Sequence, residues 1–294
     1  MAQVVGFIGL GIMGGRIARN VMKAGYALRA YNRTATKAEA LLPLGATMVA
    51  SPREAASGAD FVITMVSDPP ALAAVLEGPE GALAGCRSGT LVIDMSTMDP
   101  GTSQAMAAHA QARSLRYLEA PVTGGVGAAE HGTLTIMVGG SPEDFTLAKP
   151  LLDTMGKKVL HVGPMGHGSV LKLSANLVAA CIVTAMNEGL VLATKAGLDP
   201  TLVAEVLAER SPLIERNAPR VLTGDFAARF PLKLSHKDVN LALATGRSLG
   251  VPLSGLGAVA QLQTAALAKG LGDQDQTATI QVLEEIAGVR VRKR

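Results

Sequence analysis

The chain has 294 residues, more than one typical small domain and enough for two. Hydrophobic residues make up 48% and charged residues 17%, so there is ample material for a core and extended disorder is not expected. The net charge is only +3, and no basic stripe is interleaved with aromatic residues, so we expect no nucleic acid partner. The basic C-terminal sequence VRVRKR is interpreted as a solvated end.

Several features favour a cytoplasmic protein without a membrane partner. Cys86 and Cys181 do not make a disulfide framework, and each is interpreted as a small buried side chain in a reducing compartment. The N-terminal apolar run has no positive segment before it, which is not typical of a signal peptide. The apolar stretch 177–186 is followed by Asn187 and Glu188 and is too short to span a bilayer, which favours a buried helix.

The first half of the chain alternates apolar runs with helical patterns. Runs at 4–8, 27–31, 61–65 and 91–94 are apolar enough for both faces to be buried, and a further strand pair is predicted at 134–138 and 159–162. Helix starts are marked by a capping residue followed by proline at Ser51-Pro52, Asp99-Pro100 and Ser141-Pro142. This order predicts a parallel sheet covered by helices on both faces.

The pattern changes after Gly163. A glycine-rich break is followed by one long predicted helix, from Ser169 to about Ala196, and strand signals largely vanish. We therefore predict two domains, 1–164 with the sheet and 165–294 built of helices.

Gly9, Gly11 and Gly14 form the pattern G-x-G-x-x-G between the first predicted strand and a helical run. In dinucleotide-binding domains the first glycine allows a tight turn, the second lets the backbone approach a pyrophosphate, and the third lets helix and strand pack closely. The pattern alone is weak, but its place between strand and helix favours dinucleotide binding over a structural turn.

Residues 31–34, YNRT, end the second predicted strand, where an acidic residue usually binds the ribose 2′-hydroxyl. This chain offers Asn32 there, followed by Arg33 and Thr34. A carboxylate repels a 2′-phosphate, whereas an arginine pairs with it through charge-assisted hydrogen bonds. The stretch favours NADP(H) over NAD(H), and a solvated arginine in the loop is the structural alternative.

Four motifs occur in a fixed order along the chain. Residues 6–14 read GFIGLGIMG, residues 94–103 fit D-x-S-T-x-x-P-x-x-S, residues 163–176 fit G-x-x-G-x-G-x-x-x-K-x-x-x-N, and residues 237–242 fit K-D-x-x-L-A. Together they resemble the β-hydroxyacid dehydrogenase family, which includes 3-hydroxyisobutyrate dehydrogenase and tartronate semialdehyde reductase. The resemblance covers nearly the whole chain.

The resemblance implies an α/β fold with an N-terminal Rossmann-type doubly wound sheet, a long interdomain helix and an all-α C-terminal domain. It also implies hydride transfer between a nicotinamide and a short 3-hydroxy acid or its semialdehyde. The helical domain is expected to form a homodimer or homotetramer. The NADP(H) preference favours a reductase in the working direction.

The resemblance assigns Lys172 as the general acid/base and Asn176 as the group that orients it or binds a substrate oxygen. The two residues are four apart on a predicted helix and therefore share a face. As an ammonium, Lys172 would give a proton to the carbonyl oxygen of the substrate, and as a neutral amine it would take the hydroxyl proton in the oxidative direction.

Ser96, Thr123, Gly124 and Gly125 are the candidates for binding a substrate carboxylate. Ser96 follows a predicted strand end, where open α/β sheets place ligands, and residues 123–125 offer a hydroxyl and backbone N–H groups. A plain turn is the structural alternative. The family more often has serine where Thr123 stands, so an extra methyl group enters the predicted pocket.

Lys237 matches the family lysine near the nicotinamide, with Asp238 as its structural partner; a surface pair is the alternative. No metal is predicted, because His131, His167 and His236 show no ligand spacing. The residues predicted to bind the cofactor are Gly9, Gly11, Ile12, Met13, Gly14, Asn32, Arg33, Thr34, Met65, Val66, Thr97 and Lys237.

Three other functions compete with this interpretation. The 6-phosphogluconate dehydrogenase type is longer and carries a histidine where this chain has Ala175. Imine reductases share the fold and the NADPH preference but usually lack a lysine at the position of Lys172. A non-catalytic NADP-binding interaction module would be expected to have lost that lysine. The sequence does not identify the substrate.

Overall fold

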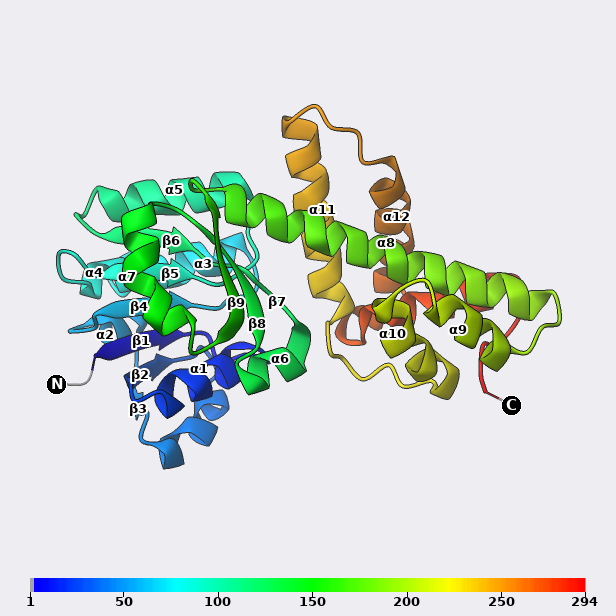
Figure 1. Ribbon diagram of the computed structural model, residues 1–294, viewed down its shortest axis with the longest axis horizontal. Helices are drawn as coiled ribbons and strands as arrows, with labels where there is room; N and C mark the ends of the chain where they lie inside the picture. Colours follow the sequence, from blue (N-terminus) through cyan, green and yellow to red (C-terminus); the bar gives the residue numbers. More distant parts are fainter. Residues whose placement is uncertain (1–2, 294) are drawn as a thin grey trace. The chain divides into compact units, whose positions relative to one another are not determined.

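The computed structural model describes residues 3–293, without the side chain of Ala38 (Figure 1). The chain divides into two compact units, Met1–Lys172 and Leu173–Arg294. The helix α8 (His167–Lys195) runs without a break from the first unit into the second. The domain boundary expected between residues 164 and 165 therefore stays a prediction.

The first unit is built on one nine-stranded sheet with the strand order β3-β2-β1-β4-β5-β6-β8-β7, and β9 pairs with β8. The strands β1 to β6 pair in parallel, in the 3-2-1-4-5-6 order of dinucleotide-binding sheets. β8 is antiparallel to β6 and β7 and parallel to β9. The strands are β1 (Val4–Ile8), β2 (Ala27–Tyr31), β3 (Thr47–Met48), β4 (Phe61–Thr64), β5 (Leu91–Asp94), β6 (Arg116–Glu119), β7 (Val122–Thr123), β8 (Leu134–Gly139) and β9 (Gly156–Gly163).

Both faces of this sheet are buried, which confirms the predicted doubly wound sheet. Along β1, Val5 and Phe7 belong to one core and Ile8 belongs to the other. The helices α1 (Gly14–Lys23) and α7 (Pro142–Leu152) contribute to the first core. The helices α2 (Pro52–Ala56), α3 (Pro69–Leu76) and α5 (Pro100–Gln111) contribute to the second. The unit also contains η1 (Ala35–Leu44), α4 (Ala82–Gly85) and α6 (Gly125–His131).

The three predicted helix starts are confirmed. The side chains of Ser51, Asp99 and Ser141 accept the backbone N–H groups three residues further on, at 3.1, 2.9 and 3.1 Å. A proline follows each cap at the first helical position. Such a cap stabilises a helix by about 1 kcal/mol, so these signals fix where α2, α5 and α7 begin.

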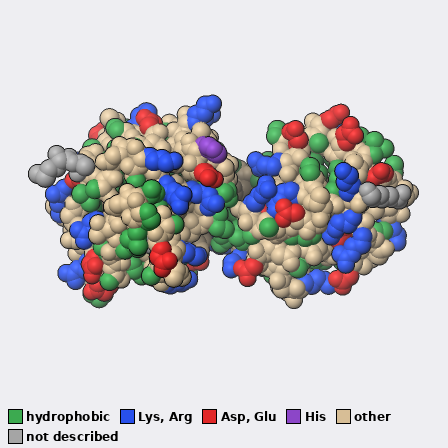
Figure 2. Space-filling model, turned by 90° about the horizontal axis from the view of Figure 1, so that it is seen from below, with side chains coloured by type: hydrophobic (Ala, Val, Ile, Leu, Met, Phe, Trp, Pro, Cys, Tyr) green, Lys and Arg blue, Asp and Glu red, His purple; other side chains and the backbone are tan. Residues whose placement is uncertain are grey.

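Every named element in the described part of Leu173–Arg294 is a helix, as predicted. After α8 the elements are α9 (Pro200–Ala208), α10 (Pro212–Thr223), α11 (Leu232–Ser248), α12 (Ser254–Ala268), η2 (Leu271–Asp273), η3 (Gln276–Thr279) and α13 (Ile280–Ala287). In the view of Figure 2, basic and acidic side chains are interspersed with hydrophobic ones over this unit.

The long helix α8 is the one described helix that is long and apolar enough to cross a bilayer by length and composition. The expectation that this region is too short to do so does not hold, because the helix has 29 residues. Its polar contacts instead indicate a packed helix. The Asn187 side chain is fully buried and donates to the carbonyl of Thr277 and the hydroxyl of Thr279.

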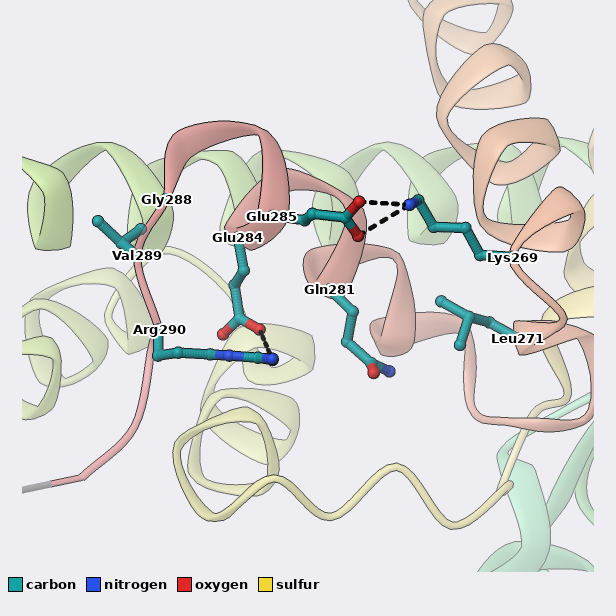
Figure 3. Close-up of a pocket in the computed structure, with 8 residues that line it drawn as sticks. All are labelled: Lys269, Leu271, Gln281, Glu284, Glu285, Gly288, Val289 and Arg290. Carbon is teal, nitrogen blue, oxygen red and sulfur yellow. Dashed lines mark hydrogen bonds and ion pairs between the residues drawn. The ribbon is translucent and has the colours of Figure 1, made fainter.

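The C-terminal segment is packed against the helical unit and not simply solvated as predicted. Val291 is fully buried, and its N–H donates to the Glu284 carboxylate at 2.8 Å. Arg290 and Arg292 both form ion pairs with the same carboxylate, and Figure 3 shows the Arg290 pair. Arg294, the last residue of the basic sequence, lies outside the described residues.

Candidate active site

The three glycines of the first turn have three different surroundings. Gly9 has a φ of +102°, and a Cβ there would lie 2.3 Å from the Met65 carbonyl oxygen. A Cβ on Gly14 would lie 2.0 Å from the Gly9 carbonyl oxygen, whereas a Cβ on Gly11 would meet no atom within 4 Å. Gly9 and Gly14 are therefore required by the turn itself. Gly11 leaves open space at the point where a pyrophosphate would approach the backbone.

The end of β2 holds this turn in place. The Gly9 N–H donates to the Tyr31 carbonyl at 2.9 Å, and the Leu10 N–H donates to Asn32 Oδ1 at 2.8 Å. Asn32 Nδ2 in turn donates to the Thr34 carbonyl at 2.8 Å. Asn32 thus bridges the glycine turn and the YNRT stretch, so its side chain is committed to backbone groups.

A cleft of about 720 Å³ opens beside these residues in the first unit. The predicted cofactor residues that line it are Gly9, Gly11, Asn32, Arg33, Thr34, Met65 and Val66. Ile12, Met13, Gly14 and Thr97 are outside the lining, and Lys237 belongs to the second unit. The structure therefore brings the glycine turn, the YNRT stretch and the end of β4 together around one cavity.

Two exposed cationic side chains, Arg33 and Lys37, line this cleft. Lys37 is absent from the sequence-based prediction. The sequence feature that could have indicated Lys37 is its position four residues after Arg33, in the first turn of η1. Three acids also line the cleft, and each has another partner. Glu54 accepts the Ala50 N–H at 3.1 Å, and Glu77 pairs with His109. Glu80 forms an ion pair with Arg53 at 3.9 Å. The cleft therefore offers two cations to an anionic group.

Ser96 is almost fully buried, with 3% of its surface exposed. Its hydroxyl accepts the Val66 N–H at 2.9 Å, and its own N–H donates to Asp94 Oδ1 at 3.1 Å. Burial raises the pKa of Asp94, and hydrogen bonds from Ser96 and Thr64 oppose that rise. Ser96 thus joins the ends of β4 and β5. This placement does not favour direct contact with a substrate, and the role predicted for Ser96 stays a prediction.

The loop Thr123–Gly125 joins β7 to α6, since Thr123 ends β7 and Gly125 begins α6, and it depends on its glycines. Gly124 and Gly125 have φ values of +136° and +73°, which other residues rarely adopt. A Cβ on Gly124 would also lie 2.6 Å from the Ala128 Cβ, whereas one on Gly125 would meet no atom within 4 Å. The half-buried Thr123 side chain precedes them. The loop therefore presents a hydroxyl and an open stretch of backbone.

Lys172 and Asn176 lie one turn apart on α8, as predicted. Lys172 is only 8% exposed. Its side chain is therefore largely withdrawn from water.

In the second unit, Asn176 and Lys237 meet on Asp238. Asn176 Nδ2 donates to Asp238 Oδ2 at 2.6 Å, and Lys237 Nζ lies 2.9 Å from Oδ1 as an ion pair without hydrogen-bond geometry. The expected pair of Lys237 with Asp238 is thus present. Its link to Asn176 was not anticipated, because residues 62 apart in sequence give no local signal. Asp238 is 4% exposed and holds both side chains.

His236 is half-buried on α11. Burial lowers the pKa of His236, which favours its neutral form. Within residues 3–293, no group of three or more His, Cys, Asp or Glu side chains is placed to hold a metal ion.

Two family descriptions match the chain in sequence. Residues 4–163 match the NAD binding domain of 6-phosphogluconate dehydrogenase, and residues 166–283 match the NAD-binding region of NADP-dependent 3-hydroxyisobutyrate dehydrogenase. The two matches meet at residues 163–166, at the glycine-rich break before α8.

Individual relatives match along nearly their full length. 2-(Hydroxymethyl)glutarate dehydrogenase of Eubacterium barkeri is 36% identical over 291 residues, which cover 98% of this chain and 97% of the relative. 2-Hydroxy-3-oxopropionate reductase of Escherichia coli is 35% identical over 286 residues, 96% of this chain and 98% of the relative. The structure of Mycobacterium tuberculosis 3-hydroxyisobutyrate dehydrogenase with L-serine superposes with a TM-score of 0.86 at 30% identity, covering 96% and 99% of the two chains.

Proposed function

The chain belongs to the β-hydroxyacid dehydrogenase family and is an oxidoreductase, and we propose that it uses NADP(H) to interconvert a short 3-hydroxy acid and its semialdehyde. One observation carries the proposal. A dinucleotide cleft with two cations occurs in the same chain as a buried lysine that is followed one helical turn later by an asparagine. A non-catalytic binding module would need the cleft but would not need the buried lysine and the asparagine.

The cleft fits a dinucleotide phosphate. The space beside Gly11 admits a pyrophosphate against the backbone, and the N-terminus of α1 follows directly. Arg33 and Lys37 would pair with a 2′-phosphate, while Thr34 adds a hydroxyl. Asn32 is less suited than the usual acid to bind a ribose hydroxyl, because it carries no charge and its oxygen already accepts the Leu10 N–H. These features support NADP(H) over NAD(H).

NADPH, when bound, supplies the hydride for reduction of the substrate carbonyl. Lys172, as an ammonium, donates a hydrogen bond and then its proton to the carbonyl oxygen as that oxygen gains negative charge. The lysine is then neutral and regains a proton from solvent. In the oxidative direction, neutral Lys172 removes the hydroxyl proton. Its burial limits competition from water for this proton.

The loop Thr123–Gly125 is proposed to bind the substrate carboxylate through the Thr123 hydroxyl and backbone N–H groups. Asn176 is proposed to orient Lys172 or to bind a substrate oxygen. Asp238 accepts a hydrogen bond from Asn176 Nδ2 at 2.6 Å, which fixes the direction in which the Asn176 amide faces. Lys237, on the same carboxylate, is proposed to lie near the nicotinamide.

A panel of carbonyl compounds with NADPH and NADH tests this function. Oxidation of NADPH at 340 nm is followed with short semialdehydes, glyoxylate, the corresponding aldehydes without a carboxylate, and cyclic imines. The proposal predicts turnover of at least one carboxylate-bearing aldehyde, loss of turnover without the carboxylate, and a lower KM for NADPH than for NADH. Turnover of imines alone would identify an imine reductase. NADPH binding with no turnover of any compound would identify a binding module.

A second copy of this chain is the proposed partner of the helical unit. Several large apolar side chains on and between α8 and α9 are about half exposed or more, namely Val178, Leu192, Leu198, Leu202 and Val206. Single exposed apolar residues are common, but a group on neighbouring helices is typical of an interface. Light scattering of the purified protein is expected to give a dimer or tetramer, and a monomer at micromolar concentration would contradict the proposal.

A further inference from the structure

Glu119, the last residue of β6, is a carboxylate with only 1% of its surface exposed. Its Oε1 accepts the N–H groups of Gly166 and Gly168 at 2.6 and 2.8 Å, and its Oε2 accepts the Ser169 N–H at 3.2 Å. The Ser169 hydroxyl donates to the same oxygen. These donors form the start of α8, where backbone N–H groups have no partner within the helix. Glu119 satisfies them and places negative charge at the positive end of the helix.

The surrounding backbone leaves room for this carboxylate and little else. Gly139 stands opposite Glu119 in the β6–β8 pairing, and a Cβ on Gly139 would lie 2.2 Å from Oε1. A Cβ on Gly168 would lie 2.6 Å from the Met137 carbonyl oxygen and 3.2 Å from Glu119. On α5, the Ser103 hydroxyl lies 3.0 Å from the Ser169 hydroxyl. The glycines therefore make a fitted site for one buried carboxylate.

Two functional segments meet at this contact. Thr123 comes four residues after Glu119 and begins the loop proposed to bind the substrate carboxylate. Lys172 comes three residues after Ser169, so the two share a face of α8 and the lysine side chain extends back over the Ser169 turn. We infer that Glu119 is a positioning residue, whose carboxylate holds the first turn of α8, and with it Lys172, at the strand that leads into the substrate loop. This inference rests on the role proposed above for Lys172.

Two titratable groups lie close to Glu119. On β5, Asp94 stands opposite Glu119 in register, and burial raises its pKa, with the charge of Glu119 adding to the rise. On β6, the Tyr117 hydroxyl has no hydrogen-bond partner among the described residues, and burial and the two carboxylates raise its pKa further. The pKa shifts of both groups are thus in the direction of their neutral forms. The segments facing Glu119 from α5 and β8 contribute Ser103, Gly139 and backbone, which do not titrate.

The variants Glu119→Gln and Glu119→Asp separate charge from position. Glutamine keeps one acceptor oxygen and the side-chain volume but removes the charge. Aspartate keeps the charge but is one methylene too short to reach all the donors. Glu284→Gln is the matched control, because Glu284 is also a 1% exposed carboxylate that accepts a backbone N–H and holds a chain segment, shown with Arg290 in Figure 3. Glu284 lies in the second unit and is not part of the proposed catalytic machinery.

The expected result for Glu119→Gln is a fall in kcat of about ten- to a hundredfold, the loss typical of a misplaced catalytic group, with the KM for NADPH nearly unchanged. The alkaline limb of the kcat/KM profile for reduction should move to lower pH, because removing a negative charge at the start of α8 makes the lysine ammonium less stable. Glu119→Asp should keep the pH limb near its wild-type position while kcat stays reduced. Glu284→Gln should lower Tm and leave the pH limb in place.

Should Glu119→Gln not fold, Ser169→Ala removes one donor to the carboxylate and should lower kcat in the same way by a smaller factor.

Two outcomes overturn the inference while keeping the proposed function: a wild-type kcat and pH limb in Glu119→Gln, or losses in Glu119→Gln and Glu284→Gln that merely follow their lowered Tm. Failure of the proposed function is recognised separately, by near wild-type turnover in Lys172→Ala. In that case an NMR titration of ¹³C-labelled lysine side chains decides the inference, since it needs no turnover. A lower titration midpoint for Lys172 in Glu119→Gln supports it, and an unchanged midpoint overturns it.

Discussion

Asn32 Oδ1 accepts the backbone N–H of Leu10 at 2.8 Å, and this single bond ties the end of β2 to the glycine turn. It explains why the position need not carry an acid. An amide oxygen meets the requirement of the turn for an acceptor without placing a negative charge beside Arg33 and Lys37. The geometry of the turn and the proposed preference for NADP(H) thus depend on the same side chain.

Asn32→Asp should reverse that preference. The aspartate keeps the acceptor for Leu10 but loses the donation to the Thr34 carbonyl, and its charge repels a 2′-phosphate. We expect the KM for NADPH to rise by about tenfold or more and the KM for NADH to fall or stay level, in steady-state assays with each cofactor. An unchanged ratio of the two constants would show that Asn32 does not face the 2′-phosphate.

Arg33→Ala should raise the KM for NADPH by about ten- to a hundredfold, the loss expected for one charge-assisted hydrogen bond. The KM for NADH should change little, because NADH has no 2′-phosphate. Lys37→Ala should act in the same direction. Arg19→Ala is the control, since Arg19 is an exposed arginine on α1 outside the cleft lining. An equal rise in KM for NADPH and NADH in Arg33→Ala would contradict the proposed contact between Arg33 and the 2′-phosphate.

Substitutions at two glycines of the turn should affect different properties, stability at Gly9 and cofactor binding at Gly11. Gly9→Ala should lower stability by about 2 kcal/mol or more, because of the φ of +102° and the contact with Met65. Gly11→Ala should leave Tm near the wild-type value, because its Cβ meets open space, yet weaken NADPH binding by about tenfold or more. Thermal melts and NADPH fluorescence titrations measure the two effects. Equal Tm losses in both variants would contradict the roles given to these glycines.

The raised pKa of Asp94 should make the free energy of unfolding decrease as pH rises. Its native pKa is raised above the ordinary value of 3.8, so the folded state holds this proton at pH values where the unfolded state has lost it. The contribution of neutral Asp94 is complete below pH 3.8 and is lost as pH rises through the native pKa. Asp94→Asn keeps an acceptor for Thr64 and should flatten the decline of Tm with rising pH in that window. A Tm profile parallel to the wild type would contradict this account.

The sequence predicted the strands whose apolar residues face both sides of the sheet. Of these, β1, β2 and β5 begin and end at the expected residues. It missed β3, β6 and β7. β3 and β7 have two residues each, too few for periodicity to appear. β6 begins with Arg116 and ends with Glu119, and a charged residue at a strand end indicates a loop unless its partners are known. The partners of Glu119 come from residues 166–169 at the start of α8, and Arg116 pairs with Asp144 of α7.

The candidate site was predictable where one local segment makes it and less so where distant segments meet. The glycine turn and the YNRT stretch could be placed together because a strand, a turn and a helix fix their spacing. The role of Ser96 stays a prediction, and the bond that its hydroxyl accepts from the Val66 N–H, in the segment after β4, could not be read from its position after β5. The hydrogen bond from Asn176 to Asp238 joins α8 to α11, and the sequence of neither helix alone predicts it.

The most direct test of the account is turnover by Lys172→Ala and Lys172→Met, measured with NADPH and the best substrate of the carbonyl panel. Methionine fills most of the buried volume of the lysine without an ionisable group. The account predicts that both variants fold, bind NADPH as the wild type does, and lose kcat by at least about a hundredfold, the lower end for general acid–base catalysis. Near wild-type kcat in either variant would contradict the assignment of Lys172 as the acid/base group.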